Sequence, residues 1–206
     1  MLLDSPLNDI FGQYSKVKIL RFLVQSQSQS NGREIAKNVG LSHVKAHTAL
    51  KDLTRQGVVN MRSAGSSLVY WLNEDHFLVK EIIRPAFEKE EGLFEYISRL
   101  ILKEISLPKP SSMILFGSFA KGNASADSDI DVVIIYPRSK NKTVISKELS
   151  EAEKKITSFF GNRLSSVPLL IDEFQKRLKT KDAFIHEIIR SGKVIYGRSI
   201  TELTGL

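Results

Sequence analysis

Two aspartates separated by one residue offer the clearest chemistry in this sequence. Asp129 and Asp131 lead into the apolar run Val132–Ile135, so an extended chain would point both carboxylates to the same face. Two ionised carboxylates so close repel each other unless a cation lies between them. Mg²⁺ fits that need because it prefers oxygen ligands and shares them readily with phosphates. Asp129 and Asp131 are therefore the predicted metal ligands, and an unpartnered structural role for them beside so apolar a run is unfavourable.

A glycine-containing turn upstream of the aspartates has the features of a phosphate-binding loop. The apolar run Ile114–Phe116 leads directly into this turn, and a short helix follows it. Glycine lets the backbone approach an anion closely, and a hydroxyl and the free N–H groups of the helix would point at the same place. The predicted nucleotide-binding residues are Gly117, Ser118, Lys121 and Ser128.

Composition excludes several classes of protein. The 206 residues include no cysteine, which rules out a disulfide scaffold, a thiolate zinc site and a cysteine nucleophile. No apolar run approaches the ~20 residues needed to span a bilayer, and the N-terminus lacks a signal-peptide pattern. We therefore expect a cytoplasmic protein with no membrane partner.

Charge is distributed unevenly along the chain. The net charge is +7, and both ends of the chain are basic while residues 76–137 are mildly acidic. Such a chain could hold a polyanion, such as DNA or a nucleotide phosphate, or could simply present a solvated lysine-rich surface. Charge alone does not decide between these two interpretations.

The first third of the sequence predicts short helices followed by a β-hairpin. Apolar residues recur at helical spacing after Ser15, which we expect to cap the first helix. A short helix over 33–39 follows, and Ser42 is the predicted cap of a longer helix that ends at Gly57. Residues 58–62 and 68–72 predict two strands joined by a turn over 63–67.

This order of elements resembles the winged helix-turn-helix domains of transcription regulators, over Leu7–Leu72. The resemblance implies that the helix after Ser42 enters the major groove and that the hairpin lies near the DNA backbone. The alternative is a small helical domain that makes protein contacts, but several basic residues on the helix, opposed only by Asp52, favour double-stranded DNA. The predicted DNA-binding residues are Ser42, His43, Lys45, His47, Lys51 and Arg62.

Residues 76–108 predict a helical connector rich in apolar side chains. Pro85 is expected to break or kink the helix, and Gly92 weakens it again, so we expect two helices. They would serve as core packing or as the seam of a homodimer. The predicted domains are 1–75, the connector 76–108, and 109–206.

The second half resembles the polymerase-β-type minimal nucleotidyltransferases, over about Ser112–Gly197. The residues that carry this resemblance are Gly117, Ser118, Gly122, Ser128, Asp129 and Asp131. It implies an α+β chain: a winged helix-turn-helix, a helical connector and a nucleotidyltransferase fold with a mixed β-sheet and helices. It also implies transfer of a nucleoside monophosphate from a Mg²⁺-bound nucleoside triphosphate, with ATP expected, at a two-metal site to a hydroxyl acceptor.

A departure from the family pattern bears on catalysis. The resemblance implies a third carboxylate on a later strand that acts as general base, and Pro168 stands at the position where we expect it. Asp172 follows four residues later, roughly 13 Å along an ideal strand, and is either that carboxylate or the N-cap of the next helix. The sequence therefore leaves open two functions. One is a nucleotidyltransferase coupled to a DNA-binding domain, and the other is a DNA-binding regulator whose degenerate transferase domain binds a nucleotide or a protein partner.

Overall fold

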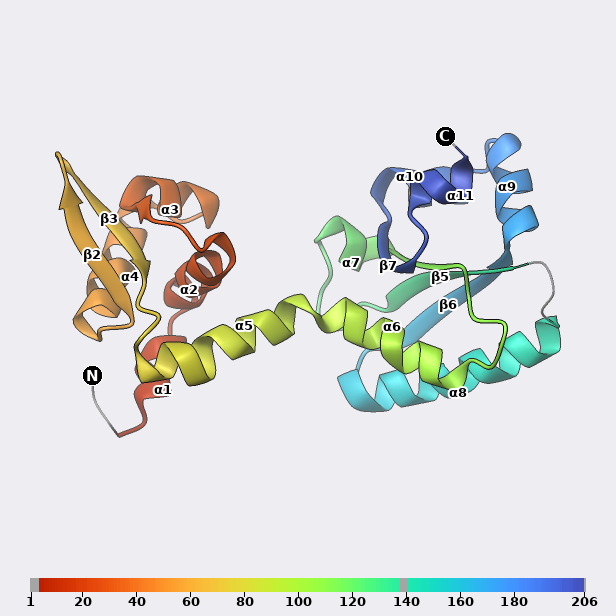
Figure 1. Cartoon of the computed structure of the whole chain (residues 1–206), viewed down its shortest axis with the longest axis horizontal. Coiled ribbons are helices and arrows are strands. Elements are labelled where there is room, and N and C mark those ends of the chain that lie inside the picture. Colours follow the sequence, from red (N-terminus) through yellow and green to blue (C-terminus); the bar gives the residue numbers. More distant parts are fainter. Residues whose placement is uncertain (1–3, 138–140, 206) are drawn as a thin grey trace. The chain divides into compact units, whose positions relative to one another are not determined.

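The computed structural model describes residues 4–137 and 141–205, and the chain divides into two compact units between Glu91 and Gly92. The first unit contains short helices and a small antiparallel sheet with strand order β1-β3-β2 (Figure 1). Its elements are α1 (Pro6–Phe11), α2 (Tyr14–Ser26), β1 (Ser30–Asn31), α3 (Gly32–Asn38), α4 (His43–Arg55), β2 (Val59–Ala64) and β3 (Ser67–Leu72). This is the order of a winged helix-turn-helix, as the sequence predicts.

Local hydrogen bonds fix where the helices of this unit begin. Ser42 caps α4, because its hydroxyl accepts a hydrogen bond from the Lys45 amide at 3.3 Å. The predicted cap at Ser15 is wrong, since α2 begins one residue earlier and Gln13 precedes it without a side-chain cap. The hairpin is also tighter than predicted: its strands pair up to Ala64 and Ser67, which leaves a two-residue turn that contains Gly65 at φ 60°.

The predicted connector over 76–108 is divided between the two units. A π-helical turn (Val79–Ile83) and α5 (Arg84–Glu91) belong to the first unit, whereas α6 (Leu93–Glu104) belongs to the second. Ile83 packs in the core of the first unit, and Ile101 packs in that of the second. Pro85 has no N–H to donate to the preceding turn, and the widened π-helical turn before Arg84 accommodates this missing hydrogen bond. The α-helix α5 therefore begins at Arg84, and it ends before Gly92.

The second unit is built on a four-stranded mixed sheet with strand order β6-β5-β4-β7 (Figure 1). Strands β5 and β6 are parallel, and β4 is antiparallel to both β5 and β7. The strands are β4 (Ser112–Phe116), β5 (Ile130–Tyr136), β6 (Leu164–Leu170) and β7 (Lys193–Gly197). The short helix α7 (Gly117–Lys121) follows β4 directly, as the turn in the sequence predicts.

Helices cover both faces of this sheet. Alternating residues of β5 separate the two cores, because Val132 and Ile134 pack on one face while Val133 and Ile135 pack on the other. The first face is covered by α6 and α8 (Lys142–Phe160). The second is covered by α9 (Ile171–Lys179), α10 (Ala183–Ser191) and α11 (Ile200–Thr204). The α+β class with a mixed sheet is confirmed.

A helix that spans a membrane must be both long and apolar. None of the helices in the described part of the chain meets both conditions.

Candidate functional site

Three neighbouring strands bring a row of side chains to one edge of the sheet. Phe116 at the end of β4 is the register partner of Asp131 on β5, and Asp131 is the partner of Ser165 on β6. Side chains that are register partners project from the same face of a sheet. This row lies on the face that α9, α10 and α11 cover, next to the turn into α7.

The backbone at Gly117 lies directly against the Asp131 carboxylate. Gly117 has φ 69°, which side-chain-bearing residues rarely adopt, and a Cβ placed on it would lie 2.3 Å from Asp131 Oδ2. A glycine is required here for both reasons. The predicted phosphate-binding turn and the predicted metal ligands therefore form one site.

The electrostatics of Asp131 favour a bound cation. Partial burial raises the pKa of the Asp131 carboxyl, a hydrogen bond from the Ser165 hydroxyl lowers it, and the negative charge of Asp129 raises it. Burial and the like charge together make the ionised form of Asp131 unfavourable without a counter-charge. A Mg²⁺ ion shared with substrate phosphates fits this pair of carboxylates.

The candidate metal ligands are a pair of carboxylates. Among the described residues, no group of three or more His, Asp or Glu side chains is placed to hold a metal ion. Asp129 and Asp131 are the residues that would hold a divalent cation, together with oxygen atoms of the nucleotide and water. When bound, Mg²⁺ would neutralise the charge of the phosphates.

The position that faces Asp131 on β6 is Ser165, not Pro168. Pro168 is the register partner of Ile134, three residues further along, and alternation places it on the opposite face of the sheet. The predicted equivalence of Pro168 with the third carboxylate is therefore wrong. Because β6 contains no Asp or Glu, the carboxylate is nevertheless missing from the strand.

Asp172 lies far from the aspartate pair along the strand direction. Residue 170 ends β6 as the partner of Tyr136, five positions beyond Asp131, which is about 16 Å along a strand. Asp172 is in the first turn of α9, and Leu170, not Asp172, precedes the helix as its N-cap. Both predicted roles of Asp172 therefore disagree with the structure.

The other predicted nucleotide-binding side chains are engaged within the protein. Lys121 at the end of α7 forms an ion pair with Glu187 of α10 at 2.5 Å, and this charge lowers the pKa of the Glu187 carboxyl. The Ser128 hydroxyl accepts a hydrogen bond from the Ser125 amide at 2.9 Å, so it stabilises the loop before β5. Ser118 lies in the first turn of α7 and is partly exposed.

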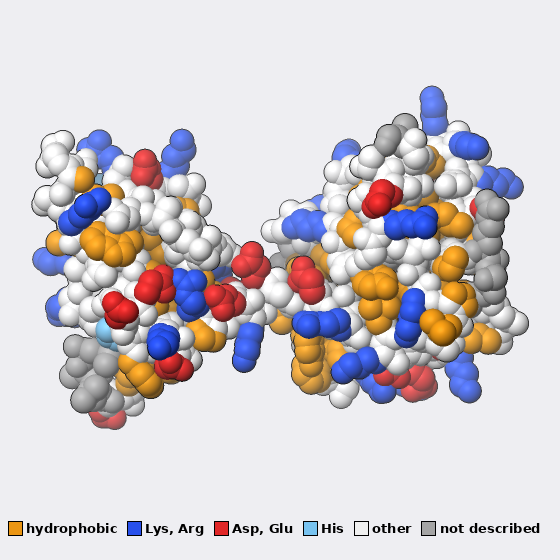
Figure 2. Space-filling model, viewed as in Figure 1, with side chains coloured by type: hydrophobic (Ala, Val, Ile, Leu, Met, Phe, Trp, Pro, Cys, Tyr) orange, Lys and Arg blue, Asp and Glu red, His pale blue; other side chains and the backbone are white. Residues whose placement is uncertain are grey.

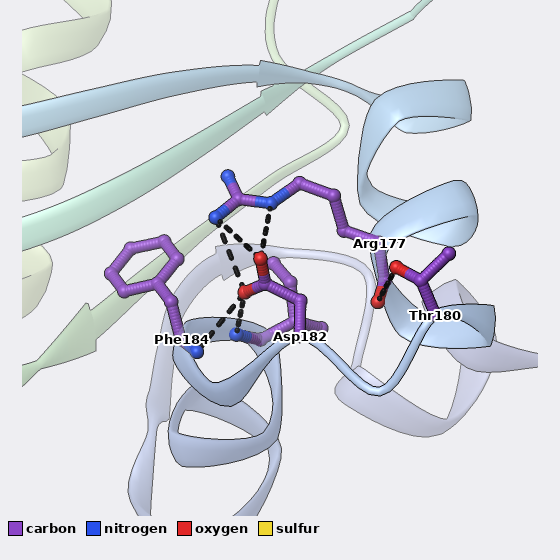
Figure 3. A network of polar contacts seen from close by, with 5 residues as sticks. Arg177, Thr180, Asp182 and Phe184 are labelled. Carbon is purple, nitrogen blue, oxygen red and sulfur yellow. Dashed lines mark hydrogen bonds and ion pairs between the residues drawn. The ribbon is translucent and has the colours of Figure 1, made fainter.

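Helix α10 supplies a wall of the site that sequence reasoning missed. The ring of Phe184 meets that of Phe116 edge to face, with centroids 5.2 Å apart. The Arg177 guanidinium lies over the Phe184 ring, 5.3 Å from its centroid, and donates hydrogen bonds to the Asp182 carboxylate (Figure 3). Asp182 also caps α10 by accepting from the amide of Phe184. Nothing in the local sequence indicates that these residues lie near Asp131, because the contact depends on how α10 packs on the sheet.

Helix α4 of the first unit exposes a basic face. Lys45, His47 and Lys51 are all exposed, as is His43, while the buried residues of the helix are Ala46, Ala49, Leu50 and Leu53. On the face shown in Figure 2, Lys and Arg side chains are spread over this unit and are interspersed with acidic ones.

The acidic residue of α4 is neutralised within the protein. Asp52 forms ion pairs with Lys16, which is only 2% exposed, and with Arg55. The hydrogen bond from Lys16 is the main reason that the pKa of Asp52 is lowered. Asp52 therefore offsets the charge of Arg55 at the end of α4, but within the described residues it forms no ion pair with Lys45 or Lys51.

Two of the predicted DNA-binding residues also have structural roles. The Ser42 hydroxyl caps α4, and Arg62 on the hairpin donates a hydrogen bond to Gln29 at 2.8 Å. Arg62 is nevertheless exposed, so it remains accessible to a partner.

Residues 96–190 match the family model of the nucleotidyltransferase domain. This range includes β4, β5, β6 and the aspartate pair, so the second unit contains the region that matches the nucleotidyltransferase domain, and the first unit has a winged helix-turn-helix fold. The match begins at Tyr96 in α6, which agrees with the packing of that helix in the second unit. No curated protein sequence matches the chain.

Three solved structures illustrate what this chain is similar to: two are toxin-antitoxin structures, and one is the protein HlyU. One is a chain of a mutant MntA-HpeT toxin-antitoxin, 17% identical over 54% of this chain and 81% of that chain, with a TM-score of 0.39. Another is the tri-AMPylated Shewanella oneidensis HEPN toxin in complex with MNT antitoxin, with 19% identity, coverage of 55% and 80%, and a TM-score of 0.35. The third is reduced HlyU from Vibrio cholerae, with 21% identity, coverage of 42% and 83%, and a TM-score of 0.35.

Proposed function

We propose that this chain is a DNA-binding protein whose nucleotidyltransferase domain binds a magnesium–nucleoside triphosphate complex but transfers nucleoside monophosphate slowly or not at all. The observation that carries this proposal is the row Phe116, Asp131 and Ser165, in which a serine faces the metal-binding carboxylate. Of the two functions that the sequence leaves open, this geometry favours the regulator.

Binding of the nucleotide requires only groups that are present. Asp129 and Asp131 would hold the metal, and the close approach of the Gly117 backbone to the Asp131 carboxylate keeps the predicted phosphate-binding turn beside this pair. Lys121 would bind a phosphate oxygen of the nucleotide after its ion pair with Glu187 is broken. Magnesium and ATP are the proposed metal and nucleotide.

Transfer to a hydroxyl requires a base that accepts its proton. A serine hydroxyl does not serve as a general base near neutral pH, because efficient proton transfer needs a group whose pKa lies near the working pH. Asp131 would be a ligand of the metal, and its remaining neighbour on this face of β6 is Ser165. The loss of this base would lower the rate by about 10²–10⁴-fold.

DNA binding rests on the exposed basic face of α4 within a winged helix-turn-helix. A helix with this placement enters the major groove in such domains, and the hairpin contacts the backbone. Neutralisation of Asp52 inside the protein leaves this face basic. A nucleotide bound in the second unit would then act as a signal for a DNA-binding protein.

Calorimetry with Mg²⁺–ATP on the full chain tests the nucleotide site. We expect wild-type protein and the variant Asp75→Asn to bind equally, because Asp75 is an exposed acid of the first unit, which does not contain the site. The double variant Asp129→Asn, Asp131→Asn should lose binding. Unchanged affinity in the double variant would rule out the site.

Incubation with labelled ATP, CTP, GTP and UTP tests the absence of efficient transfer. Wild-type protein should label itself, RNA and cell extract no faster than the double aspartate variant does. Robust transfer by the wild type would show instead that the domain is an active transferase.

A further inference from the structure

A groove in the first unit lies between the start of α3, the first turns of α4 and the hairpin β2–β3. Its volume is about 480 Å³. The residues that line it are Asn31, Gly32, Arg33, Glu34, His43, His47, Ser66, Ser67, Leu68 and Tyr70. The groove therefore connects the proposed DNA-reading helix with the hairpin, and its lining is rich in hydrogen-bond donors.

Two histidines stand side by side along one wall of this groove. The rings of His43 and His47, one helical turn apart on α4, are stacked with centroids 6.4 Å apart and 25° between their planes. Both side chains are exposed. Within the described residues, neither imidazole makes a hydrogen bond or an ion pair that would compete with a ligand.

The other charged groups that face the groove come from the neighbouring elements. Arg33 and Glu34 project from α3, and the Glu34 carboxylate accepts a hydrogen bond from the Asn31 amide at 3.1 Å. Tyr70 of β3 is buried, which raises the pKa of its hydroxyl and keeps it neutral. The hairpin contributes only uncharged residues, Ser66, Ser67 and Leu68. Lys45, Lys51 and Arg55 are the other cations exposed on α4, and Arg55 is paired with Asp52.

With both histidines neutral, Arg33 and Glu34 leave the groove without net charge. Each protonated histidine would add one positive charge, and two neighbouring imidazolium ions repel each other unless an anion lies beside them. An anion in the groove would therefore favour protonation of both rings. The reverse also holds, because protonation would strengthen binding of the anion.

We propose that this groove binds phosphodiester groups of the DNA backbone and that His43 and His47 take up protons when DNA binds. The proposal rests on the DNA-binding function proposed above and adds to it a dependence on pH. A histidine has an ordinary pKa of about 6.5, and a bound phosphate raises it. The gain in affinity is complete below the ordinary value and is lost as the pH rises through the raised value in the complex.

The test measures binding of the full chain to a labelled DNA duplex between pH 5.5 and 8 at constant ionic strength, in buffers without phosphate. A rise of one unit in the pKa of one histidine corresponds to a tenfold gain in affinity, so we expect about tenfold or more tighter binding at the lower pH. The double variant His43→Gln, His47→Gln should bind with an affinity that changes little with pH. The matched control is His186→Gln, an exposed histidine on α10, which should behave as the wild type.

Three results would overturn the proposal. Wild-type binding that does not change with pH, or a pH dependence that the double variant retains, would exclude proton uptake by the pair while leaving DNA binding intact. No binding to duplex at any pH, even at low salt, would remove the proposed DNA-binding function itself and the role of the groove with it.

Discussion

At the scale of single residues, Asp131 is placed for binding rather than for stability. Its carboxylate is partly buried, faces the charge of Asp129 and lies against the backbone of Gly117. The hydrogen bond from Ser165 offsets only part of this unfavourable environment. Groups with strongly unfavourable electrostatics are concentrated at functional sites, where a ligand supplies the missing charge.

Replacement of this carboxylate should therefore stabilise the protein when no metal is present. The pKa of Asp131 is higher in the folded than in the unfolded state, so its contribution to stability is present below the ordinary pKa of about 3.9 and is lost as the pH rises through the folded value. We expect Asp131→Asn to raise the midpoint of thermal unfolding at pH 7 and to have little effect near pH 3.

Addition of Mg²⁺–ATP should make the midpoint of thermal unfolding higher for the wild type than for Asp131→Asn. Mg²⁺–ATP binds only the folded state, so it should raise the midpoint of the wild type and not that of Asp131→Asn. Thermal unfolding with and without Mg²⁺–ATP checks both statements. A lower midpoint for the variant in the absence of ligand would show that Asp131 has a stabilising partner instead.

At the scale of elements, the sequence predicts which strands form but not how they are aligned. The apolar runs predict β4, β5 and β6, and the turn at Gly117 predicts α7 between β4 and β5. The register of β6 against β5 is a tertiary property, because it depends on packing against α8 and α9. Counting along the strand from the expected pattern therefore assigned Pro168 to a position that Ser165 occupies.

Helix α4 allows a prediction about DNA binding at the same scale. Contacts between lysines and phosphates release counterions, so affinity for duplex should fall steeply between low and physiological salt. Lys45→Ala and Lys51→Ala should each reduce the slope of log affinity against log salt by about one. Lys89→Ala, a change at an exposed lysine of α5, is the matched control and should leave the slope unchanged. Slopes that are equal in all four proteins would contradict the role of α4.

At the scale of the whole molecule, the two units have separate hydrophobic cores. The boundary could not be placed from the sequence, because apolar residues recur along the whole of 76–105 and only the packing shows which helix belongs to which core. The family of the second unit, by contrast, was predictable, since its motif is short and contiguous in the sequence.

Separate cores predict two unfolding transitions. Leu50 is fully buried in the first core, and Leu50→Ala should cost about 2–5 kcal/mol there. We expect calorimetry to show that this variant lowers one transition and leaves unchanged the transition that Mg²⁺–ATP shifts. A single transition whose midpoint is shifted both by Leu50→Ala and by Mg²⁺–ATP would mean that the two units unfold together.

The central claim is that the nucleotide site lacks one carboxylate, and that Ser165 stands where it would act. The most direct test is to install it with Ser165→Asp and to measure transfer of labelled nucleotide, with Ser165→Asn as a control of nearly equal shape and no charge. Pro168→Asp is a second control, because that side chain lies on the other face of the sheet. Our account predicts that Ser165→Asp transfers about 10²-fold faster or more than the wild type, while both controls do not. Equal rates in a folded Ser165→Asp variant that still binds Mg²⁺–ATP, or a gain with Pro168→Asp alone, would contradict it.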